Sequence, residues 1–140
     1  MTNLTPRMMK SAMIQRRVIR TNTAPEKAFN AYQESRKMNL LWDRSYTYDS
    51  EWMGYVRLQF DFVGTSGESF KVDYEIDGSK YHSSDRQKRK DNWKDRIKTD
   101  NDWKVIHIPA AITHKRFWPY LDAEIAKALA SSEMVVHIDG

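Results

Sequence analysis

The chain has 140 residues, of which 40% are apolar, and its 23 basic and 19 acidic residues give a net charge of +4. This length and apolar content predict one folded domain and argue against disorder. The absence of cysteine excludes disulfides, cysteine-ligated zinc and a thiol nucleophile. No apolar run is long enough to span a membrane and no secretory signal is visible. We therefore expect no membrane partner and a cytoplasmic location, in a bacterium or a phage-infected cell.

Basic residues concentrate in two segments of the chain. Residues 1–25 contain five basic residues and no acidic residue, and residues 85–98 contain seven basic residues against three acidic ones. The rest of the chain is therefore net acidic. Basic patches beside an acidic region are typical of proteins that bind phosphate near a metal. A charged tail and a solvated helix face would give the same pattern, so charge alone leaves both interpretations open.

The first predicted elements are an arm and a helix. Residues 1–22 are expected to form a basic N-terminal arm or short helix, ahead of a single domain over residues 23–140. A clearer helix begins at Thr23, because Thr-Ala-Pro-Glu is a capping box with proline in the first turn. This helix should end near Lys37. Residues 38–52 mix aromatic and turn-forming residues and predict no single element.

Two alternating segments follow, at residues 55–62 and 70–77. Each places apolar side chains at every second position, as a half-buried strand does. A short loop with two glycines joins them, which predicts an antiparallel hairpin. The apolar positions expected to share one face are Val56, Leu58, Phe60 and Phe62 in the first strand and Phe70, Val72, Tyr74 and Ile76 in the second.

The rest of the chain predicts helices alternating with short strands. A charged helix with a thin apolar stripe should cover residues 84–99, and a short strand residues 103–108. An amphipathic helix should cover residues 114–130, with a last strand at residues 134–138. The order α-β-β-α-β-α places a sheet between helices. We therefore expect an α/β or α+β domain with a central mixed sheet flanked by helices.

Asp61 and Glu75 are the main candidates for chemistry. Each lies near the end of its strand and, by parity, on the polar face. If the hairpin brings these faces together, the carboxylates converge, and such like charges are stabilised by a cation between them. A hard ion such as Mg²⁺ prefers carboxylate oxygens and can activate water for attack on a phosphodiester. Acids on an outward strand face are otherwise simply solvated, and parity alone does not decide between the two.

A series of motifs connects these acids to a known family. In chain order they are a capped helix with an acid (TAPEKAF), a strand ending in aspartate (LQFDF), a strand end followed by histidine (EIDGSKYH), a charged helix with an aspartate (RKDNW) and a closing strand (WKVIHIP). In these motifs the chain resembles the Vsr-like branch of the PD-(D/E)XK nucleases, which includes very-short-patch-repair and EDxHD homing endonucleases. The resemblance covers roughly Thr23 to Leu129 and implies a restriction-endonuclease-like α-β-β-α-β-α core.

The resemblance also implies roles for individual residues. Asp61 and Glu75 would be ligands of Mg²⁺ or Mn²⁺. His82 would be a general base or a group that polarises the phosphate, since the pKa of histidine lies near working pH. Glu26 and Asp91 would be supporting acidic positions of the catalytic site.

One departure from the family pattern concerns the base. The usual lysine of the E-x-K motif would stand at position 77, where this chain has Asp77. Vsr-like and EDxHD members also lack that lysine, so the identity of the base stays open, and Lys80 could reach the site from the loop. The other positions have structural alternatives: the capping box explains Glu26, helix capping explains His82, and a surface ion pair explains Asp91.

Aromatic residues and one histidine complete the candidates. Those expected in the core are Trp93, Trp103, Phe117, Trp118 and, as a buried residue with satisfied hydrogen bonds, His107. Those that could stack on nucleic acid, although core packing also explains them, are Trp42, Tyr46, Tyr48 and Trp52.

Together these features predict metal-dependent hydrolysis of phosphodiester bonds in DNA, by nicking or cleaving a duplex, a mismatch or a branched structure. No recognition domain is visible, so specificity has to come from loops, a homodimer or a recognition subunit. The first alternative is a nuclease fold that binds DNA or a protein without chemistry. The second is a winged-helix-like regulator that reads DNA with its basic helix, but the two alternating acidic strands before that helix argue against it. The bases expected to contact DNA phosphates are Arg16, Arg17, Arg20, Arg86, Lys88, Arg89, Lys90 and Lys94.

Overall fold

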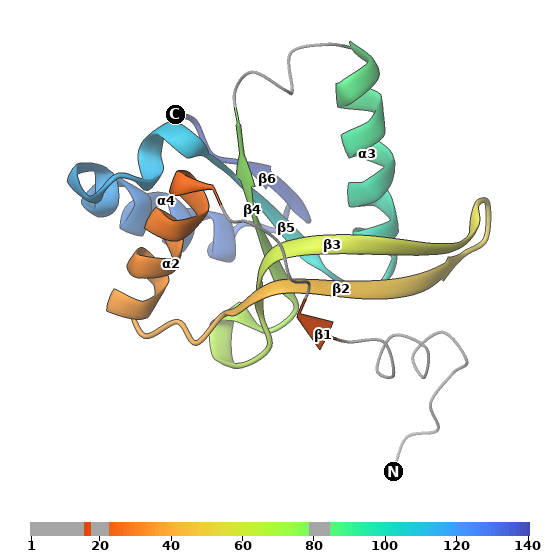
Figure 1. The fold of residues 1–140 in the computed structure, drawn as a ribbon, viewed down its shortest axis with the longest axis horizontal. Coiled ribbons are helices and arrows are strands. Elements are labelled where there is room, and N and C mark those ends of the chain that lie inside the picture. The colour runs from red at the N-terminus through yellow and green to blue at the C-terminus, as the bar shows by residue number, and fades with distance from the viewer. Residues whose placement is uncertain (1–15, 18–22, 79–84) are drawn as a thin grey trace.

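A computed structural model describes residues 16–17, 23–78 and 85–140, with side chains for residues 23–78 and 93–140. Six strands form one mixed sheet in the order β1-β2-β3-β4-β5-β6, and helices cover both of its faces (Figure 1). The expected class, a mixed sheet flanked by helices, is therefore confirmed. Within these residues no helix is both long and apolar enough to cross a membrane.

The sheet changes from antiparallel to parallel along its width. Its strands are β1 (Arg16–Arg17), β2 (Leu41–Ser50), β3 (Gly54–Gly64), β4 (Val72–Asp77), β5 (Lys104–Pro109) and β6 (Val135–His137). The first four pair antiparallel, and β5 and β6 add parallel to β4. The predicted hairpin and the two later strands are confirmed. The sequence did not predict β1, which has only two residues. It did not predict β2 because this strand buries residues on both faces and so lacks the period of two.

In the described part of the chain, three α-helices occupy the two faces of the sheet. On one face lie α2 (Ala24–Ser35) and α4 (Trp118–Ala130), and on the other lies α3 (Asp85–Asp100) (Figure 1). The predicted helices over α2 and α3 are confirmed. The last helix begins later than the predicted residue 114, because two short 3₁₀ turns precede it and Pro119 lies in its first turn, where proline is favoured.

Two apolar clusters fill the space between the sheet and the helices. The cluster below α2 and α4 includes Phe29, Tyr32, Phe62, Tyr74, Ile106 and Leu121. The cluster below α3 includes Tyr46, Tyr48, Leu58, Phe60, Ile97 and Trp103. Trp103 Nε1 donates to the Tyr48 hydroxyl at 2.6 Å within the second cluster. The core prediction for Trp103 is confirmed, and Tyr46 and Tyr48 are core residues that cannot stack on nucleic acid.

The alternation of side chains along strand β3 is interrupted at Asp61. Phe60 packs below α3, whereas Phe62 packs below α2 and α4. This corrects the prediction that both side chains share one face. Asp43, which lies across from Asp61 in β2, has a left-handed φ of 52°, and the β2–β3 pairing is interrupted there. The strand therefore rotates at Asp61.

The separation of β3 from β4 begins at the same point. The two strands pair only from Phe62 to Gly64 of β3. The part of β3 that precedes Asp61 in the chain pairs with β2 alone. The long β2–β3 hairpin then runs past α3 to its tip (Figure 1). At the opposite end of the pairing, Phe70 is 63% exposed rather than inward as predicted, because β4 begins only at Val72.

Candidate active site

Asp61 and Glu75 meet where β3 and β4 separate. The Asp61 backbone N–H donates to Glu75 Oε2 at 2.9 Å, and the Ile76 backbone N–H donates to Asp61 Oδ2 at 2.9 Å. Each carboxylate thus accepts from the backbone of the other strand in place of a ladder hydrogen bond. The structure brings together the two acids on which the sequence prediction rests.

The side chain of Lys98 extends from α3 to the same acids. Its side chain is 2% exposed, and Nζ donates to Asp73 Oδ2 at 2.7 Å and to Glu75 Oε1 at 3.2 Å. It also donates to the Gln59 carbonyl at 3.2 Å. The polar face of β4 is therefore covered by α3 and is not solvated, which corrects the simple solvated-acid alternative.

Neither Lys98 nor Asp73 was among the predicted site residues. Lys98 lies in a helix with seven basic residues, where a lysine ordinarily points to solvent, and Asp73 was placed on an outward strand face. One signal was available: neighbouring residues of an α-helix are about 100° apart, so Lys98, which follows Ile97 at the end of the apolar stripe, borders the buried face of α3. Burial of the stripe therefore also draws Lys98 toward the sheet.

Burial and neighbouring charges shift the pKa values of the acids in this cluster in different directions. Burial raises the pKa of Asp73 well above its usual value, and the negative charge of Glu75 raises it further. Burial would also raise the pKa of Glu75, but the Lys98 ammonium and hydrogen bonds from Asp73 and the Asp61 N–H lower it to about 2. The pKa values of Asp73 and Glu75 are thus shifted in opposite directions, and Glu75 is the acid that stays ionised beside Lys98.

His107 of β5 lies beside this cluster, in register with Glu75. Its Nδ1 is 2.9 Å from Asp77 Oδ2, and its Nε2 is 2.8 Å from Asp95 Oδ2 on α3. Burial would lower the pKa of His107, but hydrogen bonds to these two carboxylates raise it to about 10. The ring is an imidazolium at neutral pH. The prediction of a buried, satisfied histidine is confirmed.

The raised pKa of His107 predicts a pH-dependent contribution to stability. The groups that face it are Asp77, Asp95, Glu75 and His137. Because the folded-state pKa of about 10 exceeds the unfolded value of about 6.5, this stabilisation is complete below about pH 6.5 and is lost as pH rises toward 10. The difference in unfolding free energy between wild type and His107→Gln should therefore shrink across that range. A constant difference would show that the ring is neutral throughout.

The cluster suits a hard divalent cation in its donor chemistry. Among the residues whose side chains the structure describes, the ammonium of Lys98 is the one that opposes the carboxylates of Asp61, Asp73 and Glu75. Asp73 Oδ1 is buried and receives no hydrogen bond from any residue that the structure describes, so it needs its own proton or a cation. Oxygen donors in excess of the available cations are what Mg²⁺ or Mn²⁺ bind. Asp61 and Glu75 are the acids whose side chains are not fully buried.

Glu26 has a structural role in α2. Glu26 Oε1 accepts from the Thr23 backbone N–H at 3.1 Å and from Thr23 Oγ1 at 2.8 Å. The Thr23 hydroxyl in turn accepts from the Glu26 N–H, which completes the capping box. The capping alternative is therefore confirmed for Glu26, whereas its catalytic role stays a prediction.

A conservative substitution separates the two roles of Glu26. Glutamine also completes a capping box, so Glu26→Gln should change the unfolding free energy by less than about 0.5 kcal/mol. If Glu26 only caps the helix, DNA cleavage should also be unchanged. Cleavage lost at unchanged stability, measured by urea unfolding and a nicking assay on the same preparation, would instead assign it a catalytic role.

Several other predicted residues lie outside the described part of the chain. These are His82, Lys80 and Arg20, and for α3 the side chains of Asp91, Arg86, Lys88, Arg89 and Lys90. Arg16 and Arg17 are described only as the backbone of β1, beside β2. Lys94 is half-buried on α3, one helical turn before Lys98.

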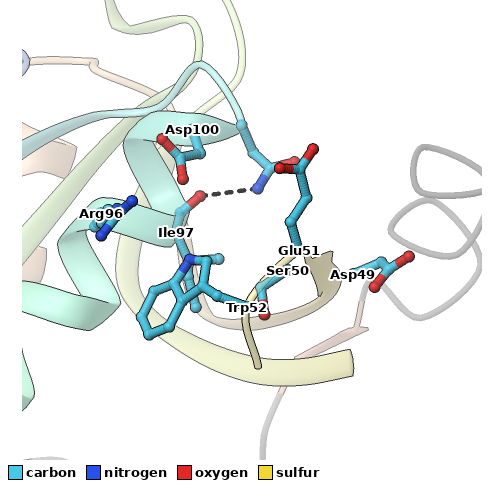
Figure 2. A pocket seen from close by; sticks show the side chains of 8 residues that line it. Asp49, Ser50, Glu51, Trp52, Arg96, Ile97 and Asp100 are labelled. Carbon is cyan, nitrogen blue, oxygen red and sulfur yellow. Dashed lines mark hydrogen bonds between the residues drawn. The ribbon is translucent and has the colours of Figure 1, made fainter. Parts of the chain in front are cut away.

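A separate pocket of about 380 Å³ lies between the tip of the β2–β3 hairpin and the end of α3. Its wall carries three acids and one arginine, and the Asn101 amide donates to the Ile97 carbonyl at 2.8 Å (Figure 2). Trp52 is 46% exposed, and the Arg96 guanidinium lies 5.2 Å from its ring centre. Of the four aromatic residues considered for stacking, Trp52 is the exposed one, but acids surround it and would repel a phosphate.

Comparisons of the chain with protein-family models, with curated proteins and with solved structures find no match.

Proposed function

We propose that the chain is a metal-dependent DNA endonuclease with a restriction-endonuclease-like core. The observation that carries the proposal is the meeting of Asp61 and Glu75 at the separation of β3 and β4. The order of elements supports it: a capped helix, an antiparallel hairpin bearing the acids, a crossover helix and a parallel strand follow one another. The observed order differs from the expected one by two additional strands, β1 before α2 and β2 before the β3–β4 hairpin.

The residues of the cluster divide into ligands and positioning residues. Asp61 and Glu75 would hold Mg²⁺ or Mn²⁺, which when bound supplies an activated water and stabilises charge on the phosphodiester. Lys98 holds the Glu75 carboxylate in its ionised form and in place against β4. With its side chain only 2% exposed, Lys98 acts through Glu75 and does not reach a DNA phosphate.

His107 does not serve as the general base in this arrangement. A base must have a free lone pair, and both ring nitrogens of His107 face carboxylates that hold the ring in its protonated form. The proton acceptor therefore has to be another group, and His82 stays the candidate that the family resemblance implies. His82→Ala would then lower the rate of cleavage with little change in DNA affinity.

A nicking assay separates the proposal from its alternative, a nuclease fold that binds DNA or a protein without chemistry. Supercoiled plasmid is incubated with the full chain in Mg²⁺, in Mn²⁺ and in EDTA. The proposal predicts nicked or linear product in either metal and none in EDTA. Plasmid that is bound but intact in both metals, including mismatched and branched substrates, would favour the non-catalytic module.

Binding to DNA phosphates is expected from the basic side of α3. Replacing Lys88, Arg89 and Lys90 with glutamate should weaken binding to all DNA sequences alike. Each lost phosphate contact lowers the slope of log K against log salt by about 0.9, so three lost contacts lower it by about 3. A matched control reverses Lys115, Arg116 and Lys127, which lie by α4 on the opposite side of the sheet. Equal slopes for wild type and the α3 variant would show that these bases do not touch phosphate.

A further inference from the structure

A second group of potential ligands lies across the three parallel strands. Neighbouring positions of β5 and β6 place His107 beside His137, and Asp77 ends β4 on the other side of His107. One ligand atom from each of Asp77, His107 and His137 lies within 4.8 Å of the others. Two imidazoles and one carboxylate are thus gathered at one end of the sheet, separate from Asp61 and Glu75.

The orientation of His107 is the one that metal-binding histidines usually have. A ligating imidazole presents one ring nitrogen to the metal and donates the other N–H to a carboxylate, which fixes the ring and strengthens the ligand. His107 Nδ1 faces Asp77, and Nε2 is held at 2.8 Å by Asp95, a residue that is 8% exposed. Asp95 lies on α3, so the holding carboxylate comes from a different layer than the ligands.

The spacing of the atoms agrees with shared coordination. Two ligands of a tetrahedral ion at about 2.1 Å are about 3.4 Å apart. Asp77 Oδ2 lies 2.9 Å from His107 Nδ1, so the two atoms need to separate by only about 0.5 Å to share an ion. The His137 ring is stacked parallel on His107, with ring centres 4.4 Å apart. His137 is exposed, so its ring can rotate toward the shared position without disturbing the core.

We propose that Asp77, His107 Nδ1 and His137 bind a divalent transition metal, of which Zn²⁺ is the representative, with Asp95 as the residue that positions His107. Nitrogen ligands favour Zn²⁺ and its transition-metal neighbours over Mg²⁺ and Ca²⁺, which prefer oxygen alone. The site does not depend on the proposed nuclease activity. It would join β4 and β6 through β5, and β6 is a short strand at the edge of the sheet.

Zn²⁺ titration of the full chain without DNA tests this site. Isothermal calorimetry in mildly alkaline buffer, where the metal readily displaces the His107 proton, should show one tight equivalent of Zn²⁺. His137→Gln should weaken this binding at least about tenfold. Asp95→Asn, which removes no ligand, should weaken it about 10- to 100-fold. His114→Gln, an exposed histidine elsewhere, is the matched control and should bind Zn²⁺ as wild type does.

Two further readouts keep the test independent of folding and of nuclease activity. Ring ¹⁵N spectra should show the His107 Nδ1 signal, but not Nε2, shifting on Zn²⁺ addition. The melting temperature should rise with Zn²⁺ in wild type and much less in His137→Gln. Equal Zn²⁺ affinity in wild type and His137→Gln, or no Zn²⁺ binding, would overturn the site. Mg²⁺-dependent nicking by the His137→Gln variant would leave the proposed function standing in either case.

Discussion

Replacing Lys98 with methionine is expected to destabilise the protein by about 3–5 kcal/mol. Lys98 is the one ammonium that the structure places against Asp73 and Glu75, and all three side chains are buried or nearly so. Methionine fills a similar volume but leaves the ionised Glu75 carboxylate in the interior with only hydrogen bonds and the charge of His107 to compensate it. The free energy of unfolding from urea titrations of wild type and variant measures the loss.

Two variants control this measurement. Lys94→Met, one turn earlier on α3, removes a charge that forms no ion pair with any side chain the structure describes, and should change stability by less than about 0.5 kcal/mol. The double variant Lys98→Met with Asp73→Asn should recover part of the loss, because an amide does not add negative charge beside Glu75. If Lys98→Met is as stable as wild type, Lys98 is a surface residue and the buried cluster does not exist as described.

Replacing Asp61 with asparagine is expected to abolish Mg²⁺-dependent cleavage. Asparagine still offers an oxygen to the Ile76 N–H, so the junction of β3 and β4 should persist and the fold and DNA affinity should change little. The variant loses the negative charge that holds the cation. A metal contributes several kcal/mol to phosphodiester cleavage, and each 1.36 kcal/mol is tenfold in rate. We therefore expect the rate to fall at least about 10³-fold.

The rate loss is measured by single-turnover cleavage with enzyme in excess of DNA. Asp100→Asn is the matched control, since Asp100 is an exposed acid of α3 outside the cluster, and it should cleave as wild type does. Glu75→Gln is also expected to lose activity but is a less clean test. Its amide would place a donor against Lys98 or the Asp61 N–H and could disturb the fold. Full activity in Asp61→Asn would remove Asp61 from the site.

Local patterns in the sequence were sufficient to predict much of the fold. The capping box at Thr23 marks the start of α2, and the alternating segments mark β3 and β4. These signals depend only on neighbours in the chain, such as a cap three residues away or a period of two. Strand β2 has no such signal, because Ser45 is buried on one side and Tyr46 on the other.

The candidate site was predicted less completely because it depends on contacts between distant segments. Strand parity correctly placed Asp61 and Glu75 together, although it did not show that Phe60 and Phe62 would face opposite layers. The Lys98 ammonium is 25 residues from Asp73 along the chain. Only the packing of α3 onto the sheet determines which of its many bases becomes buried. The sequence likewise predicted that His107 is buried with satisfied hydrogen bonds, but it did not predict that Asp77 and Asp95 are its partners.

The most direct test of the central proposal is a crystal of the protein grown with Mn²⁺, examined by anomalous scattering at the manganese edge. The proposal predicts an anomalous peak within coordination distance of the carboxylate oxygens of Asp61 and Glu75, and no such peak in Asp61→Asn. Mn²⁺ at this position would place a cation where the strands β3 and β4 separate. Crystals grown with Mn²⁺ that show no anomalous peak beside Asp61 and Glu75 would contradict the assignment of this cluster as the metal-dependent active site.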